Sequence, residues 1–312
     1  MENLNQTSVG RFILLGLSSV PGLKAVFFLV FLLMYMVTLS GNLLLIIAVR
    51  LNPRLHTPMY FFLCNLSFID ICFSTNITPK ILANTLSKDT SITLLGCAVQ
   101  LYFHLALGAT ECLILAAMAY DRYNAICKPL QYATIINPNF CMSLAVGCWT
   151  QCFSLSIIHV VFAFQLPFCK SNHVNHFFCE MPPILRLSCK DPWVNQVALY
   201  VCCAIFTLCT FVLIFLSYVH IFSTILKIHH KKGHHKAFST CASHLTVVTL
   251  YYGTIIFMYL RPQSSYSPDH DRVVSVFYTV VSPMLNPIIY CVRNKDIKGT
   301  LKNKIQFIVY LL

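Results

Sequence analysis

The chain has 312 residues, of which 57% are hydrophobic and only 10% are charged. An ordinary soluble domain has about 25% charged residues, so this composition argues against a soluble enzyme and against a disordered chain. The 22 Lys and Arg residues outnumber the 10 Asp and Glu residues and give a net charge of +12. Because these cations lie between long apolar runs, they favour lipid headgroups over nucleic acid as their partners.

Seven apolar stretches are long enough to cross a membrane, and they lack the alternation of barrel strands. Five contain no Asp, Glu, Lys or Arg, and the other two each contain one acid, Asp70 or Glu111. In a membrane the backbone must satisfy its own hydrogen bonds, so helices are expected. The sequence predicts an all-α bundle of seven transmembrane helices at about 25–50, 57–85, 92–124, 140–165, 196–227, 236–260 and 271–292.

The basic residues between the predicted spans indicate the orientation of the bundle. If residues 1–24 are extracellular, most Lys and Arg side chains lie on the cytoplasmic side, as the positive-inside rule expects. An Asn-x-Thr sequence makes Asn5 an extracellular glycosylation acceptor. In the cytoplasmic tail, 293–312, apolar residues recur every four positions from Ile297 to Ile305 and predict a short amphipathic eighth helix.

Most of the 16 cysteines lie in predicted spans, where they are expected as small buried residues. Four lie near the outside, with Cys97 at the start of the third span and Cys169, Cys179 and Cys189 in the loop from about 166 to 195. Four cysteines in an oxidising compartment allow three disulfide pairings. We predict Cys97–Cys179, which attaches the loop to the third span, and Cys169–Cys189, which folds the loop on itself.

Histidines raise the alternative of a metal site. His173 and His176 lie between Cys169 and Cys179, so the loop could bind zinc by residue type. We prefer disulfides because of the compartment. The histidines between His229 and His235 lie among lysines, and we interpret them as part of a solvated basic loop.

The chain contains none of the phosphate-loop, dinucleotide-binding, nucleophile-elbow or zinc-protease motifs, so we expect no enzyme. Asp70 and Glu111 still need an explanation, because ionisable groups inside a membrane are costly and usually functional. They could form a protonated, hydrogen-bonded pair, or they could be a cation site or a protonation switch. We expect them to face one another near Asn42 and Asn286, with a sodium ion as the candidate occupant and no other cofactor.

The third span carries a polar and small-residue stripe that should face the bundle interior. The stripe ends in Asp121-Arg122-Tyr123, a charge pair at the point where the helix leaves the membrane. This pair either anchors the helix at the interface or acts as an ionic latch that opens when a cytoplasmic partner binds. Steps of three and four residues connect the stripe's members, which are His104, Gly108, Glu111, Leu115, Met118 and Arg122.

Five ordered motifs resemble those of odorant receptors, a branch of the rhodopsin-like G-protein-coupled receptors. The third-span segment MAYDRYNAIC, Met118 to Cys127, is the first of them. Gly41-Asn42 and Trp149 also match, and the resemblance covers about 5–302. The other four motifs are Leu55–Leu63, Ser217-Tyr218, Lys236–His244 and Pro283–Tyr290.

The resemblance implies a ligand-activated receptor in the plasma membrane, in olfactory neuron cilia, that couples to a stimulatory olfactory-type G protein and raises cyclic AMP. The motif style resembles that of the tetrapod branch. Asn124, where the family usually has Val, and the 231–235 approach to the sixth span depart from the pattern. The residues that match the family's activation switch are Asp121, Arg122, Tyr123, Tyr218, His244, Asn286, Pro287 and Tyr290.

Other functions of a seven-helix membrane protein fit less well. A retinal protein needs a lysine in the seventh span, and 273–292 contains none. A transporter often shows internal repeats and broken helices, and we find no repeat between the two halves. A chemosensory receptor for a metabolite outside the nose has the same fold, and the sequence does not separate that function from odorant detection.

We expect a closed, mostly apolar ligand pocket in the outer half of the bundle, above Glu111. Small residues such as Gly108 and Ala109 either leave volume for a ligand or allow close helix packing. No basic residue reaches this depth, so we predict neutral ligands with one hydrogen-bonding group, and His104 or Tyr252 as the donor. The expected pocket residues are His104, Leu105, Gly108, Ala109, Cys112, Cys202, Cys203, Phe206, Thr207, Tyr252, Ile255, Ile256, Tyr259 and Thr279.

Overall fold

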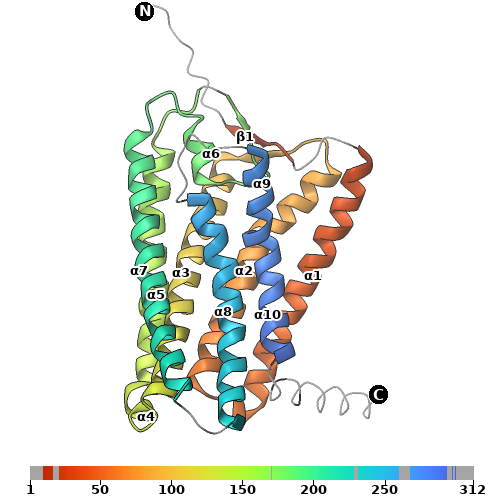
Figure 1. Ribbon diagram of the computed structural model, residues 1–312. Coiled ribbons are helices and arrows are strands. Elements are labelled where there is room, and N and C mark those ends of the chain that lie inside the picture. Colours follow the sequence, from red (N-terminus) through yellow and green to blue (C-terminus); the bar gives the residue numbers. More distant parts are fainter. Residues whose placement is uncertain are drawn as a thin grey trace, which may run out of the picture.

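The computed structural model describes residues 10–16, 21–169, 171–227, 231–259, 268–293, 297 and 299. Within these residues, seven helical segments are long and apolar enough to cross a membrane, which confirms the predicted bundle (Figure 1). They are α1 (Pro21–Leu51), α2 (Pro58–Leu86), α3 (Leu94–Cys127), α5 (Pro138–Phe164), α7 (Trp193–Ile225), α8 (Lys231–Tyr259) and the run formed by α9 (Pro268–Val276), η3 (Phe277–Val281) and α10 (Ser282–Arg293).

Helix starts follow local sequence signals. Thr93 caps α3 by accepting a hydrogen bond from the Gly96 amide at 3.0 Å. Asn137 caps α5 in the same way, from the Phe140 amide at 2.9 Å, and Pro138 occupies the first helical position, where a missing N–H costs nothing. The short elements η1 (Pro53–Leu55), α4 (Tyr132–Ile135) and α6 (Met181–Leu185) lie in the connections.

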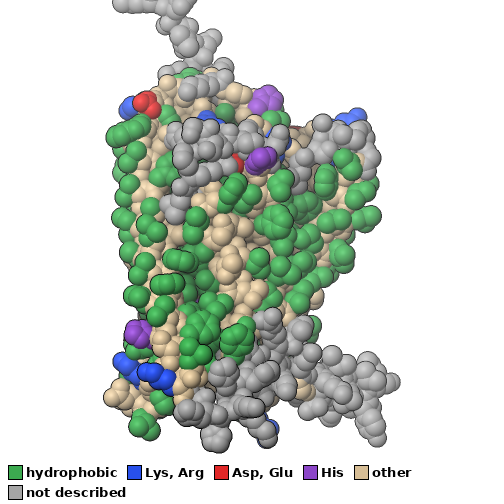
Figure 2. Space-filling model, viewed as in Figure 1, with side chains coloured by type: hydrophobic (Ala, Val, Ile, Leu, Met, Phe, Trp, Pro, Cys, Tyr) green, Lys and Arg blue, Asp and Glu red, His purple; other side chains and the backbone are tan. Residues whose placement is uncertain are grey.

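The surface of the bundle is apolar along its sides and charged near its ends. In Figure 2 hydrophobic side chains cover the sides, while Lys and Arg side chains gather near the two ends. Leu33 on α1 is 66% exposed and Phe215 on α7 is 58% exposed, as expected for side chains that face lipid. By contrast, α3 is the most buried of the seven spans, so it lies in the interior of the bundle along its length.

The seventh span differs from the single helix expected over 271–292. It contains a π-helical segment, η3, between two α-helical parts. Pro283 has no amide hydrogen to continue the α-helical ladder, and its carbonyl accepts a hydrogen bond from Asn42 Nδ2 at 3.1 Å. Such a bulge adds one residue to a turn and rotates the side chains before it relative to those after it.

A small sheet of order β2-β1-β3 caps the end of the bundle near the chain's N-terminus (Figure 1). The central strand β1 (Arg11–Leu14) pairs antiparallel with β2 (Ser91–Thr93) and parallel with β3 (His173–Val174). Burial alternates along β1, where Phe12 and Leu14 are 0% and 1% exposed, so this strand supplies core to the cap. The predicted all-α bundle contains no strand, so this sheet is a departure from the prediction.

Several expectations lie outside the described residues or shift at their edges. Asn5 and most of the expected eighth helix, 293–312, are not among the described residues. The sixth span begins at Lys231 instead of 236, because the 231–235 approach continues the helix. The end of the bundle with the sheet is called the disulfide end below, and the end with Asp121 and Arg122 is called the switch end.

Candidate functional site

Two disulfides, Cys97–Cys179 and Cys169–Cys189, form as predicted, with Cα–Cα separations of 5.5 and 5.7 Å. The zinc interpretation fails, because both cysteines of the proposed ligand set are bonded to other cysteines. Among the described residues, no group of three or more His, Cys, Asp or Glu side chains could hold a metal.

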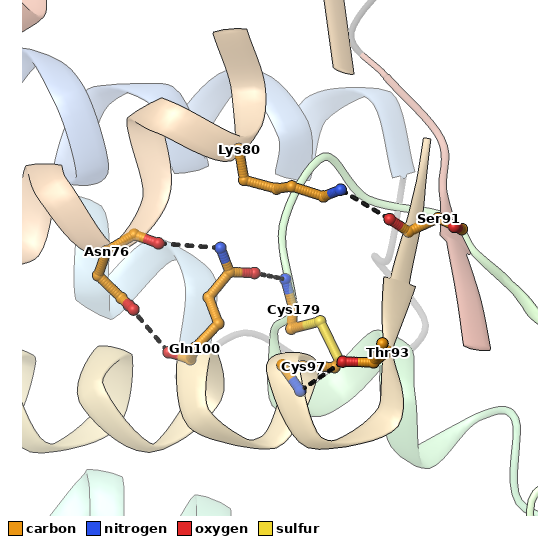
Figure 3. Close-up of a disulfide and its surroundings, with 8 residues drawn as sticks. Asn76, Lys80, Ser91, Thr93, Cys97, Gln100 and Cys179 are labelled. Carbon is orange, nitrogen blue, oxygen red and sulfur yellow. Dashed lines mark hydrogen bonds between the residues drawn. A yellow bond between two sulfur atoms is a disulfide. The ribbon is translucent and has the colours of Figure 1, made fainter. Parts of the chain in front are cut away.

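Gln100, which the sequence analysis did not identify, secures the loop beside the first disulfide (Figure 3). Its side-chain oxygen accepts from the Cys179 amide at 2.8 Å, and its Nε2 donates to the Asn76 carbonyl at 3.0 Å. Asn76 returns a hydrogen bond to the Gln100 carbonyl at 2.9 Å, and Lys80 donates to the Ser91 carbonyl at 2.6 Å. Loop, α2 and α3 therefore form one hydrogen-bonded unit at the disulfide end.

A second buried network joins the loop to the seventh span. His176 Nε2 lies 3.3 Å from Glu180 Oε2 and 3.2 Å from Ser275 Oγ, and Tyr278 donates to Glu180 Oε1 at 2.9 Å. Burial lowers the pKa of His176 to about 3, with further lowering by the nearby guanidinium of Arg272. His176 is therefore neutral near pH 7, and it holds the loop as a hydrogen-bonding group and not as a cation.

A cavity of about 110 Å³ lies below this loop, between α3, α5, α7 and α8. Ten of the fourteen expected pocket residues line it. Its wall on α3 is shaped by Gly108, where an added Cβ would lie 3.6 Å from the Tyr251 hydroxyl and 3.9 Å from Phe73. The ten are His104, Leu105, Gly108, Ala109, Cys112, Cys202, Cys203, Phe206, Thr207 and Ile255.

Tyr252, Ile256 and Thr279, although expected, are not among the lining residues. Tyr252 turns toward α7 and donates to Thr210 Oγ1 at 2.7 Å, while Ile256 is 38% exposed. Thr279 donates to the carbonyl of Ser275 at 2.6 Å. The side chain of the fourth, Tyr259, lies outside the described part of the chain.

Other residues take these positions. Tyr251 lines the cavity and donates to the Gly108 carbonyl at 2.6 Å, so α8 presents the face one residue away from the expected one. Adjacent tyrosines left the rotation of this helix ambiguous in the sequence. The full set of lining residues that sequence reasoning missed is Phe73, Cys152, Leu155, Ser156, His159, Leu199, Tyr251 and Tyr278.

His104 is the buried polar group at the top of the cavity. Its ring packs against Phe178 at 5.1 Å, Phe73 at 5.3 Å and Tyr278 at 5.8 Å between centroids. The residue is 4% exposed, and Nδ1 has no hydrogen-bond partner within the described chain. An unpaired buried nitrogen is costly, so a ligand that bonds it gains free energy.

Below the cavity, the structure brings Asp70 and Glu111 together, with Asn286 beside both carboxyl groups. Asn286 Nδ2 lies 3.0 and 3.1 Å from the two Asp70 oxygens. Asn42 is bonded to the carbonyls of Thr38 and Pro283 instead. Glu111 Oε1 has no hydrogen-bond partner among the described residues.

At the switch end, Arg122 binds Asp121 through two donors, Nε at 3.0 Å and Nη2 at 2.7 Å. Tyr132, on α4, donates to the other Asp121 oxygen at 2.7 Å. Tyr123 packs outward, against His220 at 5.8 Å between ring centroids and under the Lys128 ammonium at 5.5 Å.

A second contact joins three helices at the same level. His244 Nε2 lies 3.1 Å from the Leu115 carbonyl, which can only accept, so Nε2 carries the hydrogen. His244 Nδ1 then accepts from the Tyr218 hydroxyl at 2.8 Å. Tyr290 is buried, and its hydroxyl has no partner among the described residues.

The seventh span packs closely on α1 at Pro287. An added Cβ at Gly41 would lie 3.0 Å from Pro287 Cγ, so a larger residue at position 41 would force the two helices apart. The eight residues of the predicted switch lie on four helices, which are α3, α7, α8 and α10.

A seven-helix membrane bundle with a cavity near one end and an arginine–carboxylate pair at the other has the architecture of a G-protein-coupled receptor. Comparison with known proteins assigns it to a family within that class. The sequence profile described as olfactory receptor matches residues 31–306. The chain belongs to the olfactory receptor family.

Individual relatives are similar over almost their whole length. The chain is 49% identical to human Olfactory receptor 5G3 over 306 residues, which is 98% of each chain. It is 50% identical to human Olfactory receptor 2G3 over 298 residues, 96% of each chain. It is 48% identical to mouse Olfactory receptor 8U9 over 305 residues, 98% of this chain and 97% of the relative.

Proposed function

We propose that this olfactory receptor binds small, neutral, mostly apolar odorants in the cavity below the loop. The observation that carries the proposal is the unpaired Nδ1 of His104 in a cavity of about 110 Å³. An engineered protein cavity of roughly 150 Å³ accepts benzene, so the size suits a compact ligand. His104 would provide the hydrogen bond that orients an alcohol, ketone, ester or phenol.

The uncharged wall of the cavity supports neutral ligands. Its described lining residues include no Lys, Arg, Asp or Glu. An organic anion would lose its hydration without gaining a partner, at a large free-energy cost. The half-buried His159 on α5 and Ser156 add weaker polar contacts on a wall that is otherwise apolar.

A screen of odorants for cyclic AMP responses in cells tests this proposal. The panel pairs each carboxylic acid with the alcohol and the ester of the same carbon skeleton. We expect alcohols or esters to be the stronger agonists, and His104→Phe to weaken them about tenfold, the loss of one buried hydrogen bond. Carboxylic acids as the best agonists would contradict the proposal.

For signalling, we propose a stimulatory, olfactory-type G protein as the partner and a rise in cyclic AMP as the output. At rest Arg122 is held by Asp121. In the active state it would turn toward Tyr218 and Tyr290, which opens a crevice for the G protein. An agonist shifts this equilibrium only if it binds the open state more tightly.

The acid pair is proposed to stabilise the resting packing around a sodium ion. The support is the unpartnered Glu111 Oε1 next to Asp70. A proton shared between two close carboxyl groups is the alternative, and it would remove the need for the ion. Glu111→Gln and Asp70→Asn should each abolish the effect of sodium on basal activity, with potassium at equal ionic strength as the control. If wild-type activity is the same in both salts, sodium is not the occupant.

We propose that the disulfide end is extracellular and that the receptor works in the plasma membrane of olfactory neuron cilia. Disulfides form on the oxidising side of a membrane, which supports this orientation. Glycosidase should increase the gel mobility of the expressed receptor, and Asn5→Gln should remove most of that shift. A shift of unchanged size in Asn5→Gln would exclude Asn5 as the acceptor.

A further inference from the structure

A second cavity, of about 560 Å³, lies between α1 and α2 at the disulfide end and is larger than the cavity below the loop. Leu14 from β1 and Phe177 from the loop contribute apolar wall to it. None of its lining residues belongs to the first cavity.

The walls of this α1–α2 cavity are amphipathic along their length. Lys24, Phe27 and Phe31 follow one another on α1 at steps of three and four residues, so they lie on one face of the helix. Seven residues of helix cover about 10 Å, so the face runs from a cation to a buried aromatic ring over that depth. On the opposite wall, Ile81 provides apolar surface and Asn84 lies nearer the end of α2.

The cavity is also positively charged. Lys24 and Arg272 both line it, and its described lining includes no Asp or Glu. Arg272 reaches the cavity from α9, and its Nη2 donates to Asn175 Oδ1 in the loop, which holds the guanidinium at the rim. Two cations beside apolar walls attract an anionic headgroup with a hydrocarbon tail.

An unsatisfied buried amide adds an independent indication of a ligand. Asn84 is 9% exposed, and its Oδ1 has no hydrogen-bond partner among the described residues. The oxygen and the NH2 group of an asparagine amide have similar shapes. A 180° rotation of the Asn84 amide would therefore present N–H groups to an anion in place of Oδ1. Buried amides of this kind are usually satisfied, by water or by ligand.

From these observations we propose that the α1–α2 cavity binds an amphiphilic organic anion. The headgroup, a carboxylate or a phosphate, lies between Lys24 and Arg272, and the tail extends along Phe27 and Phe31. This ligand class is the one that the neutral cavity below the loop rejects. Acidic amphiphiles would therefore bind the receptor without occupying the odorant cavity.

A direct binding measurement tests the proposal independently of any odorant response. The full-length receptor is placed in phosphatidylcholine nanodiscs and titrated with radiolabelled dodecanoate, with dodecanol as the uncharged analogue. We expect saturable dodecanoate binding above that of empty nanodiscs. Lys24→Gln and Arg272→Gln should each weaken it about fivefold, as for a partly exposed charge pair, and should leave dodecanol binding unchanged.

Lys88→Gln is the matched control, because Lys88 is an exposed cation near the same end of α2 that does not line the cavity. It should bind dodecanoate as the wild type does. If binding is not saturable, or if Lys24→Gln and Lys88→Gln lose the same affinity, the proposal is wrong. Because Arg272 also holds the loop, Lys24→Gln is the deciding variant.

The source of the anion is settled by a second arm. Nanodiscs with a few per cent phosphatidylglycerol are compared with pure phosphatidylcholine. If membrane lipid supplies the headgroup, phosphatidylglycerol will displace dodecanoate from the wild type and copurify with it, but not with Lys24→Gln. If a free acid is the occupant, dodecanoate binding will persist in both membranes.

Discussion

The outer and inner halves of α3 are built on opposite principles, although they belong to one continuous helix. In the outer half Gly108 leaves a cavity, and His104 keeps a nitrogen without a partner within the described chain. In the inner half Arg122 makes two bonds to Asp121, and the Leu115 carbonyl is bonded by His244. An open cavity suits the place where we propose that a ligand binds, and the ion pair and the histidine bridge suit a resting state that must not signal spontaneously.

The largest expected effect is the loss of the cyclic AMP response by a change in the inner half of α3 that leaves ligand binding in the outer half intact. Arg122→Ala should abolish the cyclic AMP response, because in the proposed active state the guanidinium leaves Asp121 and binds across the crevice. Agonist binding to the purified variant should remain within about threefold of wild type, since Arg122 does not line the cavity. A normal cyclic AMP response at equal surface expression would rule out this role.

The next effect breaks the outer half alone. Gly108→Leu fills the cavity against Tyr251 and Phe73 and should raise the agonist concentration for half response about a hundredfold, because overpacking costs about 1–3 kcal/mol in addition to lost ligand contacts. Basal cyclic AMP should not change. Gly147→Leu is the control, because an added Cβ there meets nothing within 4 Å. Equal potency in the two variants would show that the ligand binds elsewhere.

A graded weakening of the latch should raise basal activity without ligand. Asp121→Asn removes the carboxylate charge that holds Arg122 and should raise basal cyclic AMP about tenfold. Tyr132→Phe removes one hydrogen bond, worth about 1 kcal/mol, and should raise it about fivefold or less. Tyr35→Phe loses a hydroxyl contact between α1 and α2 and serves as the control. The latch is refuted if neither variant exceeds Tyr35→Phe.

The smallest expected effect is a response to mild acid of the loop that covers the outer half of α3. Because the folded pKa of His176 is about 3, below the unfolded value near 6.5, the unfolded chain binds the proton more tightly. Stability is therefore highest above pH 6.5 and falls as the pH drops toward 3, by roughly 1 kcal/mol from this group at pH 5.5.

Thermal unfolding of the purified receptor at pH 7.4 and 5.5 measures this effect. The drop in melting temperature should be smaller in His176→Gln, which keeps a polar side chain but does not titrate. His173→Gln is the control, since His173 is exposed. An equal drop in all three proteins would show that His176 is not the group responsible.

Sequence reasoning succeeded where one physical term dominates. Hydropathy sets the seven spans, because burying charge in lipid is prohibitive, and the spacing of polar and small residues on the third span identified the face of α3 from His104 to Cys112. The positions of the cysteines outside the spans reduced the disulfides to three possible pairings, and the pairing chosen among them is the one that the structure contains.

The failures occurred where two local solutions have similar free energies. Tyr251 and Tyr252 offer similar faces of α8, and only packing against α3 and α7 chooses between them. The α5 wall, with Ser156 and His159, carries no polar stripe that distinguishes a cavity from a lipid-facing surface. Gln100 was missed because its partners, Asn76 and the Cys179 amide, come from distant segments.

The small sheet has a consequence for the order of biosynthesis. The strand at its centre, β1, emerges from the ribosome first, whereas β3 follows only after four spans have been made. Until His173 and Val174 appear, one edge of β1 stays open, and an open edge is a template for wrong pairing. Cys179, the second half of the first disulfide, follows directly afterwards. The cap therefore cannot close before the chain has been made as far as Cys179, and a nascent receptor that stalls before residue 173 leaves one edge of β1 open.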